Sequence, residues 1–261
     1  MTRDRMTMRF LPVLAFLLGA CGFTPTLIFY ESRLTASSVG DEPESRLVRE
    51  GATATYSIEG LRVRVEPMTD TGLNALFPED SERGFFATNP YTYGNWIDPH
   101  LGYTPNRFTV FRVTVINDIY AKVLLDPLKP ELYTGRGEVH HSYGIPSFSP
   151  HQSFERYYRA IRGQSGNEFY RFDLRMGNVR STAYLQGQMV FKGESYSGFL
   201  IFDPLAEEVA EVELVLKDFV LKFDASGQPL ETVDVAIRFD RYIAKEEKAQ
   251  IADATSDGVS E

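Results

Sequence analysis

The motif in this sequence that most resembles a catalytic site is formed by residues 193–198, Gly-Glu-Ser-Tyr-Ser-Gly. In many hydrolases a G-x-S-x-G motif places a serine nucleophile on a tight turn between a strand and a helix. Here Ser197 occupies the position of the second glycine, and the next residues, 199–202, are Phe-Leu-Ile-Phe, which favours a strand. We therefore expect a β-turn at this place and no catalytic role for Ser195.

The four histidines are a second group that could do chemistry, because imidazoles held close together bind Zn²⁺ or Cu²⁺. All of them lie between residues 100 and 151. Neighbouring side chains on a strand point to opposite faces, which would separate His140 from His141. No H-x-x-x-H or H-E-x-x-H spacing occurs among them. We expect no metal site and no cofactor, with His100, His140, His141 and His151 exposed or hydrogen-bonded.

The only cysteine, Cys21, follows a basic segment and a short apolar run. Residues 1–9 contain three arginines and one aspartate, and residues 10–18 are apolar and uncharged. The apolar run is too short to span a bilayer, which takes about 20 residues. A basic start followed by such a run is typical of a secretory signal peptide. Because Cys21 has no partner cysteine, the chain has no internal disulfide.

Residues 18–21, Leu-Gly-Ala-Cys, resemble the lipobox of bacterial lipoproteins. The resemblance implies cleavage after residue 20, lipidation of Cys21, and a mature chain held on a membrane by its acyl chains. Burial of each CH₂ group in the bilayer contributes roughly 0.8 kcal/mol, so three chains make dissociation negligible. Gly22, the residue after the cysteine, favours the outer membrane over the inner one in a cell that has two. The predicted signal peptide is residues 1–20, and the predicted location is the cell envelope.

The charge of the chain narrows the choice of partners. The formal net charge is −9, and removal of residues 1–20, with three arginines and one aspartate, takes it to −11. An excess of this size argues against binding to nucleic acid and against broad adhesion to anionic lipid. The predicted partners are therefore the membrane, through Cys21, and an envelope protein or glycan.

Aromatic residues are concentrated in a long loop, residues 85–103, where asparagines and aspartates stand between them. Aromatic faces can stack on sugar rings while neighbouring amides and carboxylates bind the hydroxyl groups, so the loop could bind a glycan. The alternative is that the rings fix a long loop to the domain, and we favour this alternative because such loops need anchoring. The candidate ligand-binding residues are Tyr91, Tyr93, Trp96 and Tyr103.

Arginines are concentrated in residues 155–180, a segment with six arginines, three acidic residues and a net charge of +3 in an acidic protein. Guanidinium groups suit carboxylate and phosphate partners. The alternative is a solvated helix face, which is the more usual role of such residues. The candidate interaction patch contains Arg156, Arg159, Arg162, Arg171 and Arg175.

The pattern of apolar residues predicts a mainly β fold. Residues 61–65 and 111–115 alternate strictly between apolar and polar side chains, as half-buried strands do. Residues 151–162 instead place Phe154, Tyr157, Tyr158 and Ile161 on one face of a helix. We predict an antiparallel β-sandwich over residues 52–243 with a helical insertion around 150–184. Residues 21–51 would be the lipid anchor and a tether, and residues 244–261 a disordered acidic tail.

A second resemblance concerns residues 113–117, 123–126 and 190–202. They resemble an immunoglobulin-like domain of unknown function that is common in bacterial lipoproteins. In that family a strand ends in Asn, and a Pro-Gly-Glu-Ser turn joins two later strands. This chain has Lys192 in place of the proline and an insertion at about residues 143–184. The resemblance implies a fold and a location but no activity.

These patterns together favour a membrane-anchored, non-catalytic envelope lipoprotein that presents a β-sandwich surface to a partner. The first alternative is a glycan- or peptidoglycan-binding lipoprotein that uses the aromatic loop. The second is an enzyme whose mechanism the sequence does not reveal. An exposed Trp96 beside a groove would favour glycan binding, and a buried Trp96 would favour the interaction protein.

Overall fold

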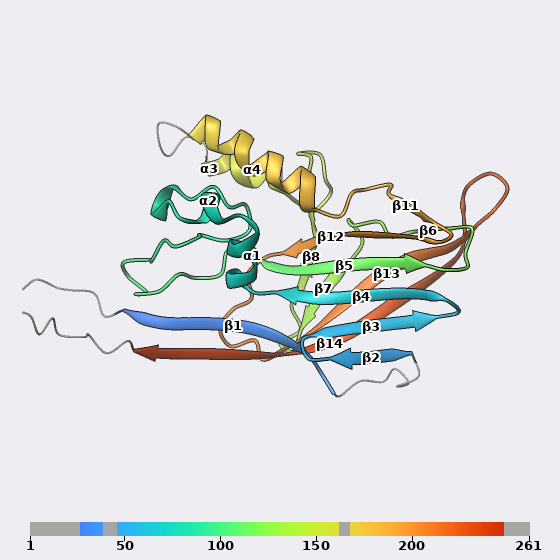
Figure 1. Ribbon diagram of the computed structural model, residues 1–261, viewed down its shortest axis with the longest axis horizontal. Coiled ribbons are helices and arrows are strands. Elements are labelled where there is room, and N and C mark those ends of the chain that lie inside the picture. The colour runs from blue at the N-terminus through green and yellow to red at the C-terminus, as the bar shows by residue number, and fades with distance from the viewer. Residues whose placement is uncertain (1–26, 39–45, 162–167, 248–261) are drawn as a thin grey trace, which may run out of the picture.

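A five-stranded antiparallel sheet contains the two segments with the strictest alternation (Figure 1). The structure is a computed structural model, and it describes residues 27–38, 46–161 and 168–247. Alternate side chains of β4 and β5 are fully buried on one face of this sheet, as their period of two predicts. The strand order is β12–β5–β4–β3–β2, with β2 (Leu47–Glu50), β3 (Thr53–Ile58), β4 (Leu61–Met68), β5 (Thr109–Asn117) and β12 (Glu194–Phe202).

A seven-stranded antiparallel sheet faces the first one. Its central order is β1–β14–β13–β6–β11, and β7 pairs with β13 and carries β8 at its other edge. The last two long strands form a hairpin around the turn at residues 225–229, which begins after Asp224; the Asp224 carboxylate accepts hydrogen bonds from the amides of Ser226 and Gln228. The strands are β1 (Ile28–Ala36), β6 (Lys122–Leu124), β7 (Glu131–Thr134), β8 (Val139–His141), β11 (Met189–Phe191), β13 (Glu211–Phe223) and β14 (Pro229–Glu247).

The main core lies between the two sheets. Phe111 of β5 contacts Phe239 of β14 with ring centroids 5.3 Å apart, and it contacts Phe202 of β12 at 6.0 Å. Buried Leu214 and Ile237 from the seven-stranded sheet complete the same cluster. Two antiparallel sheets that share one apolar interior form a β-sandwich, which confirms the predicted fold class at this level.

Helices cover the outer face of the five-stranded sheet and create a second core. Phe199 and Ile201 of β12 pack there against Phe154, Tyr158 and other residues of the helices. The predicted stripe on residues 154–161 does face inward: Phe154 and Tyr158 are fully buried, and Tyr157 and Ile161 are partly buried. The elements of this layer are α1 (Asp70–Leu76), α2 (Pro78–Ser81), the 3-10 helix η1 (Gly84–Phe86), β9 (Tyr143–Gly144), β10 (Gln152–Ser153), α3 (Phe154–Ile161) and α4 (Glu168–Thr182).

Gly198, the last residue of the Gly-Glu-Ser-Tyr-Ser-Gly segment, allows the chain after α4 to approach β12. A Cβ atom on Gly198 would lie 2.5 Å from the Cα atom of Tyr184, so any larger residue would clash with backbone. The amide of Tyr184 donates a hydrogen bond to the carbonyl of Phe199 across this contact. The glycine therefore serves packing between the layers.

Both predicted chain-end boundaries are wrong where the structure describes them. The tether predicted at residues 21–51 includes two strands, β1 and β2, and β1 pairs with β14 along its full length, from Ile28 opposite Glu247 to Ala36 opposite Phe239. The same pairing keeps β14 ordered to Glu247, inside the predicted tail 244–261. The sequence gives little sign of β1 because its side chains are mostly partly buried and do not alternate.

The remaining chain-end predictions lie outside the described residues. These are the signal peptide 1–20, Cys21, and residues 248–261 of the tail. In the described part of the chain, the helices are all too short or too polar to cross a membrane.

Candidate functional site

Two of the four aromatic candidates, Tyr91 and Tyr103, are buried anchors of the loop. Tyr91 is fully buried in the second core, and its hydroxyl lies 2.6 Å from the hydroxyl of Thr182. Tyr103 stacks on Tyr30 of β1 with ring centroids 4.4 Å apart and donates a hydrogen bond to Glu207. Neither ring is available to stack on a sugar, which is contrary to their predicted role as ligand-binding residues.

The other two aromatic candidates are partly buried. Trp96 packs against Phe85 and Tyr93, with ring centroids 5.8 and 5.5 Å apart. The guanidinium carbon of Arg107 lies 4.1 Å from the centre of the Tyr93 ring, a cation–π contact that covers one face of that ring. The four candidate residues therefore do not form one exposed surface on which a sugar ring could stack.

The predicted arginine patch does not form one free surface. Arg175 is buried, donates a hydrogen bond of 3.0 Å to the carbonyl of Ala87, and lies over the ring of Tyr158. Its inclusion in an exposed patch was wrong, because α4 turns this side chain into the second core. Arg171 lies with its guanidinium carbon 4.3 Å from the centre of the Phe86 ring.

The arginines of α3 are also engaged. Arg156 donates hydrogen bonds to the carbonyls of Ser147, Ser149 and His151, so it holds the chain that leads into the helix. Arg159 pairs with Glu155 one turn away at 3.6 Å. Arg162 lies outside the described residues.

The serine and histidine motifs have ordinary surroundings. Gly193, with φ at +82°, forms the expected turn between β11 and β12, and Ser195 follows on a strand and not before a helix. His141 stacks on His151 with ring centroids 3.8 Å apart, an association that the sequence did not suggest. Over the described ranges, no cluster of three or more His, Cys, Asp or Glu residues is arranged to hold a metal ion.

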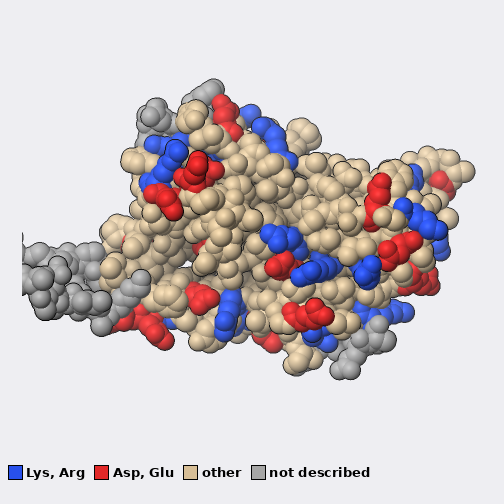
Figure 2. All heavy atoms as spheres, in the orientation of Figure 1, with Lys and Arg blue, Asp and Glu red and all other residues tan. Residues whose placement is uncertain are grey.

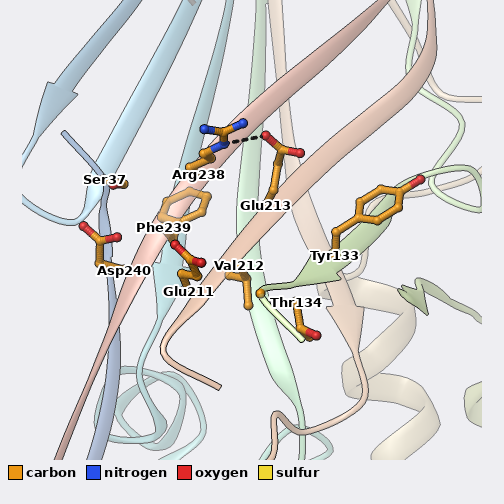
Figure 3. A pocket seen from close by; sticks show the side chains of 10 residues that line it. Ser37, Tyr133, Thr134, Glu211, Val212, Glu213, Arg238, Phe239 and Asp240 are labelled. Carbon is orange, nitrogen blue, oxygen red and sulfur yellow. Dashed lines mark hydrogen bonds and ion pairs between the residues drawn. The ribbon is translucent and has the colours of Figure 1, made fainter. Parts of the chain in front are cut away.

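An acidic groove, which sequence patterns did not indicate, opens on the outer face of the seven-stranded sheet (Figure 3). Val212 and Phe239 point into the core, so the residues that alternate with them point outward into the groove. The groove has a volume of about 360 Å³. It is lined by Ser37, Tyr133, Thr134, Gly135, Glu211, Val212, Glu213, Arg238, Phe239 and Asp240.

Pairing between β13 and β14 determines the charges of this groove. Glu213 is opposite Arg238, and the Arg238 Nε atom donates to a Glu213 carboxylate oxygen at 2.9 Å. One step along, Glu211 is opposite Asp240, and Figure 3 shows both carboxylates on the same side of the sheet. Like charges directly opposite each other on a sheet are destabilising. The groove therefore carries an acidic pair that a cation would stabilise.

A second pocket, of about 180 Å³, lies between β1, α1 and the aromatic loop. Burial raises the pKa of its Asp70 carboxyl to about 7, although a hydrogen bond from Asn106 and the charge of Arg107 oppose that rise. The Asn106 Oδ1 atom is buried, with no hydrogen-bond partner within the described part of the chain. The pocket is lined by Tyr30, Glu31, Ser32, Thr69, Asp70, Thr71, Asn74, Gly94, Thr104 and Asn106.

Comparison of this chain with models of known families, with curated proteins and with solved structures finds no match.

Proposed function

We propose that this chain is a lipid-anchored, non-catalytic protein of the cell envelope that presents one face of its β domain to a partner. Support comes first from residues 1–21, in which a basic start, an apolar run and Leu-Gly-Ala-Cys follow in the order of a lipoprotein signal. Gly22 favours the outer membrane in a cell with two membranes.

The observation that carries this proposal is the short stretch of chain between Cys21 and the first strand. β1 starts at Ile28, seven positions after Cys21, and seven residues span at most about 25 Å when fully extended. β1 is paired along its whole length with β14. A lipid on Cys21 would therefore hold the domain near the bilayer through a strand of the sandwich itself.

The acidic groove is the surface that we propose for the partner. Its Glu211 and Asp240 are opposite each other, and a basic segment of an envelope protein would relieve their repulsion. The aromatic loop supports glycan binding less well, because Tyr91 and Tyr103 are buried. The groove needs no reacting group for this role.

We also propose that the sandwich is immunoglobulin-like. The side chain of Asn117 at the end of β5 supports this: it donates to the carbonyls of Tyr120 and Val190 at 2.8 and 3.0 Å and accepts from the amide of Tyr120 at 2.9 Å. The turn at Gly193, which joins β11 to β12, is a second feature of the resemblance.

The anchor is tested with Cys21→Ser and metabolic labelling by a fatty-acid probe. We expect the wild-type chain to carry the label and to fractionate with membranes, and the serine variant to lose both properties because the hydroxyl is not a substrate for lipidation. A wild-type chain without label, or a labelled serine variant, would contradict the proposal.

The groove is tested with the double variant Glu211→Gln/Asp240→Asn, compared by cross-linking and recovery from native membranes. We expect the wild-type chain to recover a basic partner at low salt, less of it at high salt, and the double variant to lose it. Glu50→Gln/Glu79→Gln is the matched control, because it removes the same charge from exposed positions elsewhere. Equal recovery by both double variants would exclude the groove as the binding surface.

A further inference from the structure

The start of β1 and the aromatic loop lie at the same end of the molecule (left in Figure 1), and both carry exposed apolar side chains. Leu27, Phe29, Ile97 and Leu101 are 44, 42, 45 and 40% exposed, and we call these four residues the apolar tip. Leu27 and Phe29 flank the first residue of β1, and Ile97 and Leu101 belong to the aromatic loop. The amide of Ile28 donates to the carbonyl of Gly102 at 2.9 Å, which joins the two parts of the tip.

The loop holds its share of the tip in a defined conformation. The carboxylate of Asp98 accepts hydrogen bonds from the amides of His100 and Leu101 at 2.8 and 3.2 Å. The backbone closes the same turn, because the amide of Gly102 donates to the carbonyl of Asp98 and the amide of Asp98 donates to that of Tyr103. An ordered turn that displays apolar side chains to water is unfavourable unless another surface covers it.

We propose that the apolar tip lies in the interface of the lipid bilayer to which Cys21 is attached. This inference rests on the proposed lipid anchor. Ile28, between two tip residues, is seven positions from Cys21, so the anchor would hold the tip within about 25 Å of the bilayer. Attachment makes the contact intramolecular, so a weak apolar interaction is sufficient to orient the domain.

The charges near the tip indicate which kind of lipid surface it fits. On the face drawn in Figure 2, uncharged residues lie at the left end of the described domain, with acidic residues below them and charges of both signs above them. Lys245 at the end of β14 is paired with Glu207 at 3.3 Å, and the adjacent Glu246 is opposite Phe29. Because its lysine is paired and the neighbouring residue is acidic, this end should not be attracted to anionic headgroups. The contact therefore depends on apolar burial and should occur on a zwitterionic bilayer at any salt concentration.

The single tryptophan makes the contact measurable, because Trp96 precedes Ile97 in the chain. The full chain, purified from membranes, is placed in phosphatidylcholine vesicles whose acyl chains carry bromine near the headgroup, and Trp96 fluorescence is recorded. We expect bromine to quench the wild-type signal about twofold, with no effect of salt, because the tip inserts at that depth. The variant Ile97→Ser/Leu101→Ser should lose most of the quenching.

The matched control is Ile119→Ser/Leu230→Ser. These side chains are 51 and 69% exposed, and Leu230 lies at the start of β14, whereas the tip adjoins its end. This variant should be quenched like the wild type. Absent wild-type quenching, or equal quenching of both double variants, would overturn the proposed insertion.

Mass spectrometry of Cys21 separates a failure of the anchor from a failure of the tip. A purified chain with a free Cys21 thiol would contradict the proposed lipoprotein. The same thiol is then coupled to a maleimide phospholipid, which supplies an anchor at the same position, and the quenching comparison is repeated. If quenching of this coupled chain depends on Ile97 and Leu101, the tip inserts although the natural lipid anchor is absent. If the coupled chain shows no such quenching, insertion of the tip is excluded.

Discussion

The buried surroundings of the Asp70 carboxyl group disfavour its ionised form. It lies at the start of α1 and lines the pocket beneath the aromatic loop. Burial raises its pKa from 3.8 to about 7, even though Asn106 and Arg107 favour the ionised form. At neutral pH this acid is therefore close to half protonated, and its protonation is linked to the stability of the fold.

Asp70→Asn should remove a pH dependence from the stability of the domain. Because the folded-state pKa is raised, the wild-type chain binds its proton more tightly when folded. The resulting stabilisation is complete below about pH 4 and is lost as the pH rises through 7. As the pH rises over this range, the asparagine variant should become more stable than the wild type. The difference in the free energy of unfolding should reach about 4 kcal/mol at pH 8. Urea unfolding at pH 4.5, 6 and 8 measures the difference.

Glu79→Gln is the control for this series, because Glu79 is exposed. Its stability should follow that of the wild type at each pH. If Asp70→Asn also follows the wild type at each pH, the carboxyl of Asp70 does not have the raised pKa.

The aromatic loop is held by its buried rings, and the exposed ones contribute less. Tyr91 packs edge-on against Phe154 and Phe199 at centroid distances of 6.1 and 5.4 Å, which ties the loop to α3 and to β12. Trp96 packs against two rings of the same loop, the exposed Phe85 and the partly buried Tyr93. A long loop between β4 and β5 is thus fixed at a few points and displays the residues between them.

Truncation of the two rings should separate these roles. Tyr91→Ala should lower the free energy of unfolding by about 3–5 kcal/mol, because it empties a space in the second core. Trp96→Ala should cost about 1–2 kcal/mol, since its ring is only partly buried. Chemical denaturation of both variants tests whether Tyr91→Ala lowers the free energy of unfolding more than Trp96→Ala does.

Tyr91→Phe is the matched control, because it keeps the ring and loses only the hydrogen bond with Thr182. It should cost about 1 kcal/mol. A cost for Trp96→Ala equal to that of Tyr91→Ala would mean that Trp96 is a main anchor of the loop.

The pairing of the first and last described strands adds β1 to the edge of the seven-stranded sheet and brings both ends of the described chain together (Figure 1). Leu34 of β1 enters the main core, and Arg241 of β14 donates to the hydroxyl of Ser32 at 2.9 Å. The segment next to the proposed anchor is therefore part of the folded domain. A force or a contact at the membrane would act directly on the sandwich.

A chain that begins at residue 37 should be much less stable than one that begins at Cys21. Loss of β1 leaves the β14 edge unpaired and removes Leu34 from the core, and the leucine alone accounts for about 2–5 kcal/mol. Thermal unfolding of the two chains measures the difference. Leu34→Ala in the full chain gives the core contribution if the shorter chain does not fold. Equal melting temperatures for the two chains would show that β1 is a dispensable tether.

Local patterns in the sequence predict the parts of the fold whose cause is local. The alternation in β4 and β5, the inward stripe on α3 and the turn at Asp224 each depend on residues a few positions apart, and the structure contains all of them. The turn at Gly193 belongs with them, because the residues that follow it favour a strand. The cleavage site and lipidation of Cys21 remain predictions from the same kind of local pattern.

The features of the fold that local patterns do not predict depend on contacts between segments that are distant in the sequence. β1 is ordered because β14, some 200 residues later, supplies its hydrogen-bond partners. Arg175 belongs to an arginine-rich segment, yet α4 turns it into the second core, and only the packing of α4 determines that direction. The acidic groove likewise joins Ser37, Tyr133 and Glu211 from three separate strands or strand ends. Burial and strand pairing depend on which elements meet, and no pattern within one segment contains that information.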